Sequence, residues 1–95
     1  MLGMTDRRNP VFSDQGEYHD PVRDVVVFAA EDGKKSIQCA ISDEALCDHF
    51  GGDGKNPLKV FLANRERIWH EARRKYLAEK FEPDGSVLLR TEDIG

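Results

Sequence analysis

The chain has 95 residues, 39% of them hydrophobic and 34% charged, with a formal net charge of −4, which predicts one globular domain near the lower size limit for a self-sufficient core. No apolar run approaches the roughly 18 residues of a membrane span, and Met1 to Arg8 lacks the apolar stretch of a signal peptide. Two cysteines, Cys39 and Cys47, are too few for a disulfide framework, so we expect a cytoplasmic protein in a reducing compartment.

The charge is distributed unevenly along the chain. Residues 57–82 carry seven Lys or Arg and four Glu, a balance of +3, whereas the remainder carries seven basic and fourteen acidic residues, a balance of −7. A basic segment within an acidic chain raises the hypothesis of nucleic-acid binding. The positions of the basic residues must decide whether that hypothesis holds.

The first part of the chain predicts little regular structure. Residues 1–10 are polar and are expected to be disordered or frayed, ahead of a single domain over residues 11–91. Val11 and Phe12 predict a short N-terminal strand or an edge contact. Ser13 to Pro21 is rich in acids and turn formers, which predicts a loop.

Two strands joined by a tight turn follow. Val22 to Ala30 is β-branched and aromatic at its centre, as strands prefer. Its apolar residues lie on both faces, which indicates a central strand or one partly covered on its second face. Asp32-Gly33 is a strong hairpin signal between two such runs. We therefore expect residues 35–41, in which alternate residues are apolar, to return as an antiparallel strand.

A short helix is predicted from Asp43 to Phe50. Ser42 precedes it as an N-cap, and Asp43 and Glu44 lie in the first turn, where the helix dipole favours negative charge. Gly51 supplies the left-handed residue that ends the helix. Residues 53–55 are expected to form a flexible connector to the next element.

The next element is predicted as one long amphipathic helix over residues 57–81. Asn56 is placed to cap it, Pro57 suits the first helical position, and no Gly or Pro follows until Pro83. Apolar residues at spacings of three and four define the side that faces the core: Leu58, Phe61, Leu62, Ile68, Trp69, Ala72 and Tyr76. Trp69 is therefore expected in the core and not on a ligand-binding surface.

The C-terminal part predicts one more strand. After a turn at Pro83 to Gly85, residues 86–90 should rejoin the sheet, and residues 92–95 should form a polar tail. With the short N-terminal strand included, the order is β-β-β-α-α-β. We predict an α+β fold, in which a small antiparallel sheet packs against one short and one long helix.

A dispersed set of residues is shared with a known family. The set includes Val26-x-Phe28-x-Ala30, Ile37-x-Cys39-x-Ile41-Ser42-x-Glu44-Ala45-Leu46, Asp48-His49-Phe50-Gly51, the helix positions Phe61, Arg65, Ile68, Ala72 and Tyr76, and Gly85-x-Val87-x-Leu89. In this pattern the chain resembles DUF1488, a small bacterial family of unknown function, over roughly residues 11–93. The resemblance implies a bacterial cytoplasmic α+β domain and supplies no catalytic residues. Most matching positions are packing or capping positions.

The residues that could carry chemistry form no recognised constellation. Cys39 is expected on a strand, and Cys47 and His49 on the following helix, where these two lie about 200° apart around the axis. They cannot easily chelate one ion or act together as nucleophile and base. Glu44 and Asp48 share a helix face, but no cleft is predicted around them. We therefore predict no catalytic residue, no metal and no cofactor, and a protein that is not an enzyme.

Arg65 is the residue whose position most requires an explanation. At 100° per residue it falls between Leu62, Trp69 and Ala72 in the middle of the apolar side of the helix, where an unpaired charge is unfavourable. Its side chain must extend past Trp69 to solvent, stack on an aromatic ring, or pair with a carboxylate of another element or subunit. We expect an ion pair that fixes helix docking or a partner, and the alternative is binding of an anionic ligand.

Two functions of different class remain. The first, which we expect, is a non-catalytic protein-interaction or self-associating module. The alternative is a nucleic-acid-binding regulator that uses basic residues of the long helix, namely Arg65, Arg67, Arg73, Arg74, Lys75 and Lys80. A helix that binds phosphates needs its basic groups on one face, whereas these are scattered around the axis. We therefore expect neither nucleic acid nor a membrane as partner.

A homodimer is also predicted. A single helix over residues 57–81 would be about 37 Å long, which exceeds the width of about 32 Å expected for a compact domain of this size. A second, weaker apolar patch lies away from the core-facing side and consists of Val60, Ala63, Leu77 and Phe81. Exposed patches of this kind often mark symmetric interfaces. The alternative is that the N-terminal Val11-Phe12 covers this patch within the same chain.

Overall fold

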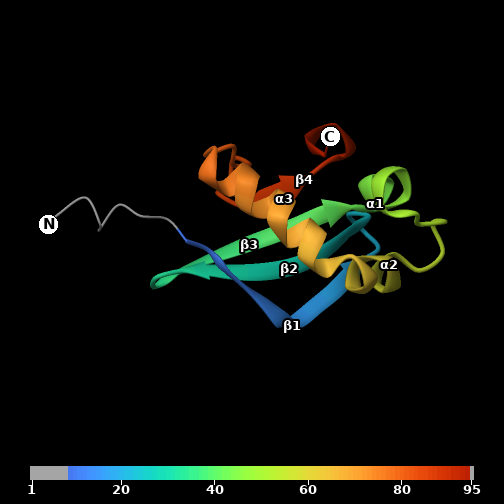
Figure 1. The fold of residues 1–95 in the computed structure, drawn as a ribbon, viewed down its shortest axis with the longest axis horizontal. Coiled ribbons are helices and arrows are strands. Elements are labelled where there is room, and N and C mark those ends of the chain that lie inside the picture. Colours follow the sequence, from blue (N-terminus) through green and yellow to red (C-terminus); the bar gives the residue numbers. More distant parts are fainter. Residues whose placement is uncertain (1–8, 95) are drawn as a thin grey trace, which may run out of the picture.

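The computed structural model describes residues 9–94, in which a four-stranded sheet carries three α-helices (Figure 1). In chain order the elements are β1 (Val11–Asp20), β2 (Val25–Asp32), β3 (Lys35–Ser42), α1 (Asp43–Phe50), α2 (Pro57–Ala63), α3 (Arg65–Leu77), β4 (Val87–Leu89) and the short 3-10 helix η2 (Thr91–Asp93). None of the helices in this part of the chain has the length and apolar character needed to cross a membrane.

The strands are arranged in the order β1-β2-β3-β4. β1, β2 and β3 are antiparallel neighbours, whereas β4 runs parallel to β3, with Val87 opposite Cys39 and Leu89 opposite Ile41. The predicted α+β fold is confirmed, but the expectation of a wholly antiparallel sheet is wrong. Because three helices lie between β3 and β4, the chain crosses back over the sheet before its last strand, and such a crossover returns the strand in parallel.

The predicted hairpin of β2 and β3 is confirmed. The two strands pair with Phe28 opposite Cys39, and Gly33 supplies a positive φ of 65° in the turn between them. β2 begins at Val25, later than predicted, because residues 21–24 form a turn. This turn is stabilised by Asp20, whose side-chain oxygen accepts backbone N–H groups of the turn at 3.0 and 3.3 Å.

The first strand is longer than predicted, and the expected loop at residues 13–21 is wrong. β1 extends over Val11–Asp20 and pairs with β2 at both of its ends. Between Ser13 and Tyr18 the register shifts in a bulge, and Gly16 there has a φ of 80°. The turn formers of this stretch therefore mark an irregularity inside a strand.

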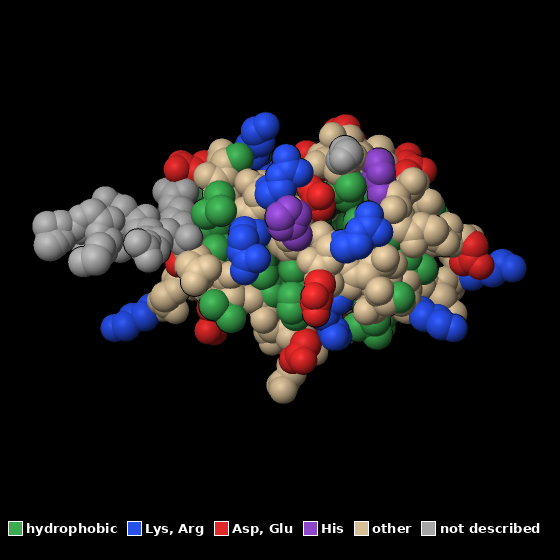
Figure 2. Space-filling model, in the orientation of Figure 1, with side chains coloured by type: hydrophobic (Ala, Val, Ile, Leu, Met, Phe, Trp, Pro, Cys, Tyr) green, Lys and Arg blue, Asp and Glu red, His purple; other side chains and the backbone are tan. Residues whose placement is uncertain are grey.

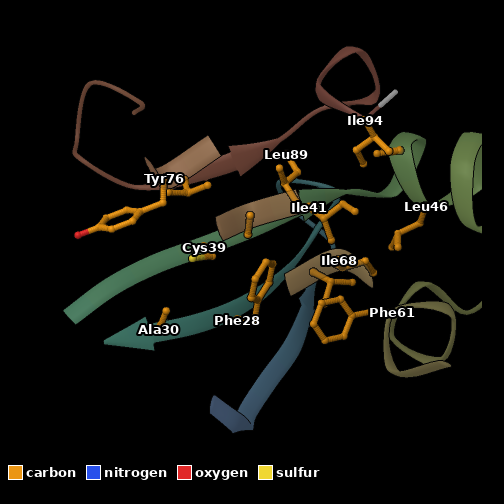
Figure 3. Close-up of a cluster of buried hydrophobic side chains, with 14 of the residues drawn as sticks. Phe28, Ala30, Cys39, Ile41, Leu46, Phe61, Ile68, Tyr76, Leu89 and Ile94 are labelled. Carbon is orange, nitrogen blue, oxygen red and sulfur yellow. The ribbon is translucent and has the colours of Figure 1, made fainter. Parts of the chain in front are cut away.

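The core lies between the sheet and the helices. Figure 3 shows Phe28, Ile41, Phe61 and Ile68 converging from β2, β3, α2 and α3. The ring centroids of Phe28 and Phe61 are 5.1 Å apart, and burial of each such side chain contributes about 1.5–3 kcal/mol. The face of the sheet that is turned away from the helices has a smaller buried cluster of Val25, Val27 and Ala40. The apolar residues on both faces of β2 thus belong to an inner strand with two buried clusters.

The predicted long helix is in fact two helices. α2 ends at Ala63 and α3 begins at Arg65, and Asn64 between them leaves the helical backbone with φ −123° and ψ 20°. The side-chain Nδ2 of Asn64 donates to the carbonyl oxygen of Val60 at 2.9 Å. Asparagine side chains compete for backbone hydrogen bonds in this way, so Asn64 interrupts the helix without a Gly or Pro signal.

This break changes which residues face the core. The predicted core residues Phe61, Ile68, Ala72 and Tyr76 are buried. Leu62, also predicted there, is instead 44% exposed, because a short α2 adopts its own rotation relative to the sheet. α3 ends at Leu77 and not at Phe81, and Glu79 follows in the left-handed region with φ 60°. Pro57 occupies the first position of α2 as predicted, but Asn56 makes no side-chain cap.

Both ends of the described chain pack more closely than predicted. The frayed segment expected at residues 1–10 falls largely on residues 1–8, which lie outside the described residues, but Pro10 is fully buried. At the other end, the expected polar tail contains η2 and Ile94, which is 8% exposed and belongs to the core. The Lys75 ammonium meets the Asp93 carboxylate at 2.7 Å and anchors this segment to α3.

Phe61 and Leu62 are adjacent in sequence but differ in burial, which allows a direct test of the helix break. We expect Phe61→Ala to lower the free energy of unfolding by about 3–5 kcal/mol, because it leaves a cavity beside Phe28. Leu62→Ala should change it by about 0.5 kcal/mol or less. Chemical denaturation followed by Trp69 fluorescence measures both. Equal losses of unfolding free energy in the two variants would indicate that Leu62 faces the core, as one uninterrupted helix over residues 57–81 predicts.

Asp93 makes stability depend on pH. Burial disfavours its charged form, but hydrogen bonds from the Lys75 ammonium and the Arg90 backbone N–H outweigh this effect and lower the pKa of Asp93. A carboxyl whose pKa is lowered by folding contributes stability above its unfolded pKa of about 3.9, and that contribution is lost as the pH falls through the folded pKa. Thermal unfolding at several pH values should show that Asp93→Asn is less stable at neutral pH and loses less stability below about pH 4. Parallel pH curves for the two proteins would contradict this.

Candidate functional site

Arg65, at the start of α3, forms an ion pair with Glu17 of β1. Its Nε donates to Oε2 of Glu17 at 3.0 Å and its Nη2 to Oε1 at 2.5 Å, so the contact is bidentate. The Glu17 side chain is only 3% exposed and that of Arg65 is 28% exposed. The hydrogen bond to Glu17 is the main reason why the pKa of Arg65 is raised. The cation on the core-facing side of the helix is thus neutralised within the same chain.

The bulge in β1 is what allows Glu17 to reach Arg65. Phe12 and Glu17 both contact α3, although residues an odd number of positions apart point to opposite faces of a regular strand. Between Ser13, opposite Ala29, and Tyr18, opposite Val27, β1 advances five residues while β2 advances two. The three extra residues of β1 are an odd number and so reverse the alternation. Both side chains can therefore face the helices.

A stack of side chains extends from this ion pair along α3. Trp69 and Arg73 follow Arg65 at intervals of one turn, and the ring of Phe12 stacks on Trp69 with centroids 5.6 Å apart and planes at 14°. The guanidinium groups of Arg65 and Arg73 lie 5.7 and 5.5 Å from the Trp69 and Phe12 rings, respectively. We call these residues, with Glu17, the α3–β1 seam. Trp69, which the sequence predicts in the core, is partly buried and packs against the core cluster.

The break at Asn64 is accompanied by a groove between the helices. Two hollows of about 440 and 350 Å³ adjoin at Ala63 and Asn64. We call the combined surface the elbow groove, and its lining is Phe50, Gly51, Asp53, Lys55, Asn56, Lys59, Val60, Leu62, Ala63, Asn64, Arg65, Glu66 and Arg67. Phe50, 9% exposed, and the partly buried Val60 are its most enclosed apolar residues. The hollows are shallow and their lining is mixed, with apolar side chains between polar and charged ones, so this surface is a candidate for contact with a partner and not an enclosed small-molecule site.

The polar groups around the elbow groove are mainly cationic. Lys55, Lys59 and Arg67 carry positive charge there, against Asp53 and Glu66. The Asp53 carboxylate accepts the backbone N–H of Lys55 at 2.9 Å, so part of its hydrogen-bonding capacity is used within the loop. Together with Arg65, whose charge is matched by Glu17, the lining holds four cations and two carboxylates, so the surface of the groove has a small positive excess.

Basic side chains continue from the elbow groove along the outer side of α3. Arg67, His70 and Arg74 are exposed and are separated by three and four residues, so they lie on one side of the helix. Figure 2 shows Lys, Arg and His side chains gathered over this helix. Glu71 offsets part of this charge, since its carboxylate lies 3.1 Å from the Arg74 guanidinium.

The residues predicted as a dimer surface do not form one patch. Val60 packs partly buried against the core, next to the elbow groove. Leu77, the last residue of α3, and Phe81, beyond its end, are 47% and 38% exposed and are separated from Val60 by the length of α3, about 20 Å. Phe81 packs against the Tyr76 ring with centroids 5.6 Å apart. The strand residue Phe12, considered as an alternative cover for the patch, packs on Trp69 instead.

The residues considered for chemistry are separated or engaged in other contacts. Cys39 is buried in β3, where burial raises the pKa of its thiol to about 12. Cys47 is exposed on α1, and the Nε2 of nearby His49 is hydrogen-bonded to the carbonyl oxygen of Thr91 at 2.9 Å. Within residues 9–94, no three His, Cys, Asp or Glu side chains gather in a way that could hold a metal ion.

Sequence reasoning missed several residues of the site. Glu17 falls inside the expected loop, and Phe50, Lys55 and Lys59 come from separate segments that only the folded chain brings together. The one signal available for Glu17 was indirect, since a charged residue on the core-facing side of a helix requires an oppositely charged partner.

Comparison with known proteins shows one family. The profile of DUF1488, described as a protein of unknown function, matches residues 11–89. The chain is also similar to the crystal structure of a protein of unknown function from the DUF1488 family of Shewanella loihica PV-4, with a TM-score of 0.75 and 21% sequence identity, over 87% of this chain and 93% of that one. No curated protein matches the chain.

In the Arg65–Glu17 pair the Glu17 side chain is much more buried than that of Arg65. This difference predicts the relative stability of variants that remove one partner or both. Arg65→Met should lower the free energy of unfolding by about 3 kcal/mol, because it leaves the buried Glu17 without a partner. The double variant Arg65→Met/Glu17→Gln should recover part of this loss, since no unpaired charge remains. Lys59→Met, at an exposed position, is the control. A double variant that is less stable than Arg65→Met would show that the unpaired charge of Glu17 is not what destabilises the single variant.

Proposed function

The chain belongs to the DUF1488 family, whose description assigns no function, and on that premise we propose that it is a non-catalytic protein-interaction module that binds a partner at the elbow groove. The observation that carries the proposal is the groove itself, in which an apolar centre at Phe50 and Val60 is bordered by the cations Lys55, Lys59 and Arg67. Interfaces combine an apolar, well-packed centre with a polar rim in the same way.

Several contacts support binding over catalysis. A nucleophilic cysteine needs a thiolate, and burial raises the pKa of Cys39 far above neutral pH. His49 is held by a backbone carbonyl, and His19 of β1 contacts Asp43 at 2.9 Å, so each imidazole has a structural role. The polar side chains of the elbow groove include neither a cysteine nor a histidine. Its chemistry therefore suits recognition.

The nucleic-acid alternative has less support. Arg67 and Arg74 are exposed on one side of α3, which is the arrangement that phosphate binding needs. However, Arg65 is paired with Glu17, Arg73 donates to the carbonyl oxygen of Pro10 at 2.9 Å, and Lys75 is paired with Asp93. These three cations stabilise the fold, so fewer remain for a polyanion than the sequence count suggests.

Self-association is one form that this function could take. The helix-length argument for a homodimer no longer applies, because α2 and α3 are separate. Leu77 and Phe81, four residues apart, are still exposed, and Leu62 is exposed at the elbow groove. A second copy of the chain is therefore among the partners that the experiment below must distinguish.

Site-specific photo-crosslinking tests the proposed function. With p-benzoylphenylalanine at position 59, in cells that naturally express the protein, we expect a covalent adduct with a defined protein after illumination. The same probe at Gln38, an exposed position of β3, should give no such adduct. Mass spectrometry identifies the captured chain, and peptides from the protein itself would indicate self-association.

The control position makes the result decisive. Absence of an adduct at position 59, or the same adducts at positions 59 and 38, would contradict the proposal that the elbow groove binds a protein. Each labelled protein must first show the thermal unfolding midpoint of the unmodified chain, so that a loss of capture is not a loss of fold.

A further inference from the structure

Resting on the proposed function, we propose that the partner presents to the elbow groove an extended acidic segment with an apolar side chain at its centre. The apolar side chain would pack on the accessible parts of Val60 and Leu62, and carboxylates on either side of it would meet the cations of the groove. This deepens the proposed function by naming the chemistry of the partner.

The apolar anchor follows from the apolar side chains that line the two shallow hollows of the groove. Phe50 at the end of α1 and Val60 on α2 line the larger hollow of about 440 Å³. Leu62, 44% exposed, extends the apolar surface into the adjoining hollow of about 350 Å³. Removal of one aliphatic or aromatic side chain of the partner from water against this surface supplies a non-directional driving force.

The acidic character follows from the balance of free charge. Lys55, Lys59 and Arg67 face the groove, and none of them forms an ion pair with another of the described residues. Arg65 also lines the groove, but Glu17 already satisfies its guanidinium. Asp53 is partly satisfied by the backbone of its own loop. Asp53 and Glu66 offset two of these three charges, and the net charge that remains is positive, so carboxylates of a partner complement it.

The basic residues outside the groove set a direction for the segment. Arg67 belongs both to the groove and to the exposed line that continues through His70 to Arg74. A segment that leaves the groove along α3 would pass over these side chains, which Figure 2 shows gathered on that helix. Acidic residues are therefore expected on the side of the anchor that follows α3.

A protein segment suits this surface better than a nucleic acid. Single-stranded nucleic acids stack their bases on exposed aromatic rings, whereas the Phe50 ring is 9% exposed and lies under the Arg67 guanidinium at 4.8 Å. Glu66 and Glu71 lie along the path and would repel a continuous row of phosphates. A peptide can place its carboxylates to avoid them.

Fluorescence anisotropy with defined probes tests the proposal on the purified full chain. The first probe is a fluorescein-labelled peptide of about ten residues in all, in which Asp or Glu alternates with Ser on either side of a central Leu-Phe pair, and which spans about 33 Å when extended. Two matched peptides replace the acids by Lys or the Leu-Phe pair by Ser-Ser, and an oligothymidylate of similar length tests nucleic acid. We expect binding of the first probe only, weakened between about 0.05 and 0.3 M salt.

Charge-reversal variants locate the site. Lys59→Glu should weaken binding of the acidic Leu-Phe peptide about tenfold, and Lys59→Glu/Arg67→Glu should weaken it further, by about 1.4 kcal/mol for each factor of ten. Lys34→Glu makes the same change of charge in the hairpin turn, at the opposite end of the sheet from α2 (Figure 1), and should have little effect. If the double variant does not fold, the single variant Lys59→Glu still tests whether the peptide binds at the groove.

Three results would overturn the proposal. Equal binding of the Leu-Phe and Ser-Ser peptides would show that no apolar side chain of the partner contributes to binding. Equal losses of affinity in Lys59→Glu and Lys34→Glu would show that the peptide does not bind at the elbow groove. Preferential binding of oligothymidylate would favour the nucleic-acid alternative. If photo-crosslinking at position 59 captures a protein but no acidic peptide binds, the proposed function stands and only the partner chemistry fails. If neither is observed, both fail.

Discussion

The arrangement of β1 and α3 depends on one charge, the guanidinium of Arg65 on the side of α3 that faces the sheet. An unpaired cation there is unfavourable. The acceptor is Glu17, on a strand that must be distorted to present it. Phe12 and Trp69 then stack beside this pair. The ion pair thus joins the outer strand to the helix layer and sets where α3 begins, next to the elbow groove.

The parts of the fold that could be predicted are those that local physics determines. The turn at Gly33, the alternation of β3 and the caps of α1 each depend on neighbouring residues, and all are present: the Ser42 hydroxyl accepts the Ala45 N–H at 3.0 Å, and Gly51 ends α1 in the left-handed region. The parallel position of β4 could not be predicted in this way, because it depends on how three helices fit across the sheet.

The errors of prediction share a cause. Gly16 and Asn64 carry local signals that have more than one outcome: the glycine is compatible with a loop or a bulge, and the asparagine with a helical position or a break. Tertiary contacts decide between these outcomes. The elbow groove follows from the break at Asn64 and draws its lining from three segments. The sequence singled out Arg65, Val60 and Ala63 as candidate contact residues and Arg67 as a basic residue of the helix, but it could not bring them together in one groove.

The distortion of β1 also protects the outer rim of the sheet. An edge strand exposes backbone N–H and C=O groups to which the strand of another molecule can add, and long regular edges promote fibril growth. Here the bulge divides the rim into two short regular pieces, and the stretch between them carries Asp14 beside the left-handed Gly16. A strand of another molecule would therefore meet neither a continuous row of backbone hydrogen-bonding groups nor an uncharged edge. The feature that aims Glu17 at Arg65 therefore also hinders polymerisation of the protein into amyloid-like fibrils.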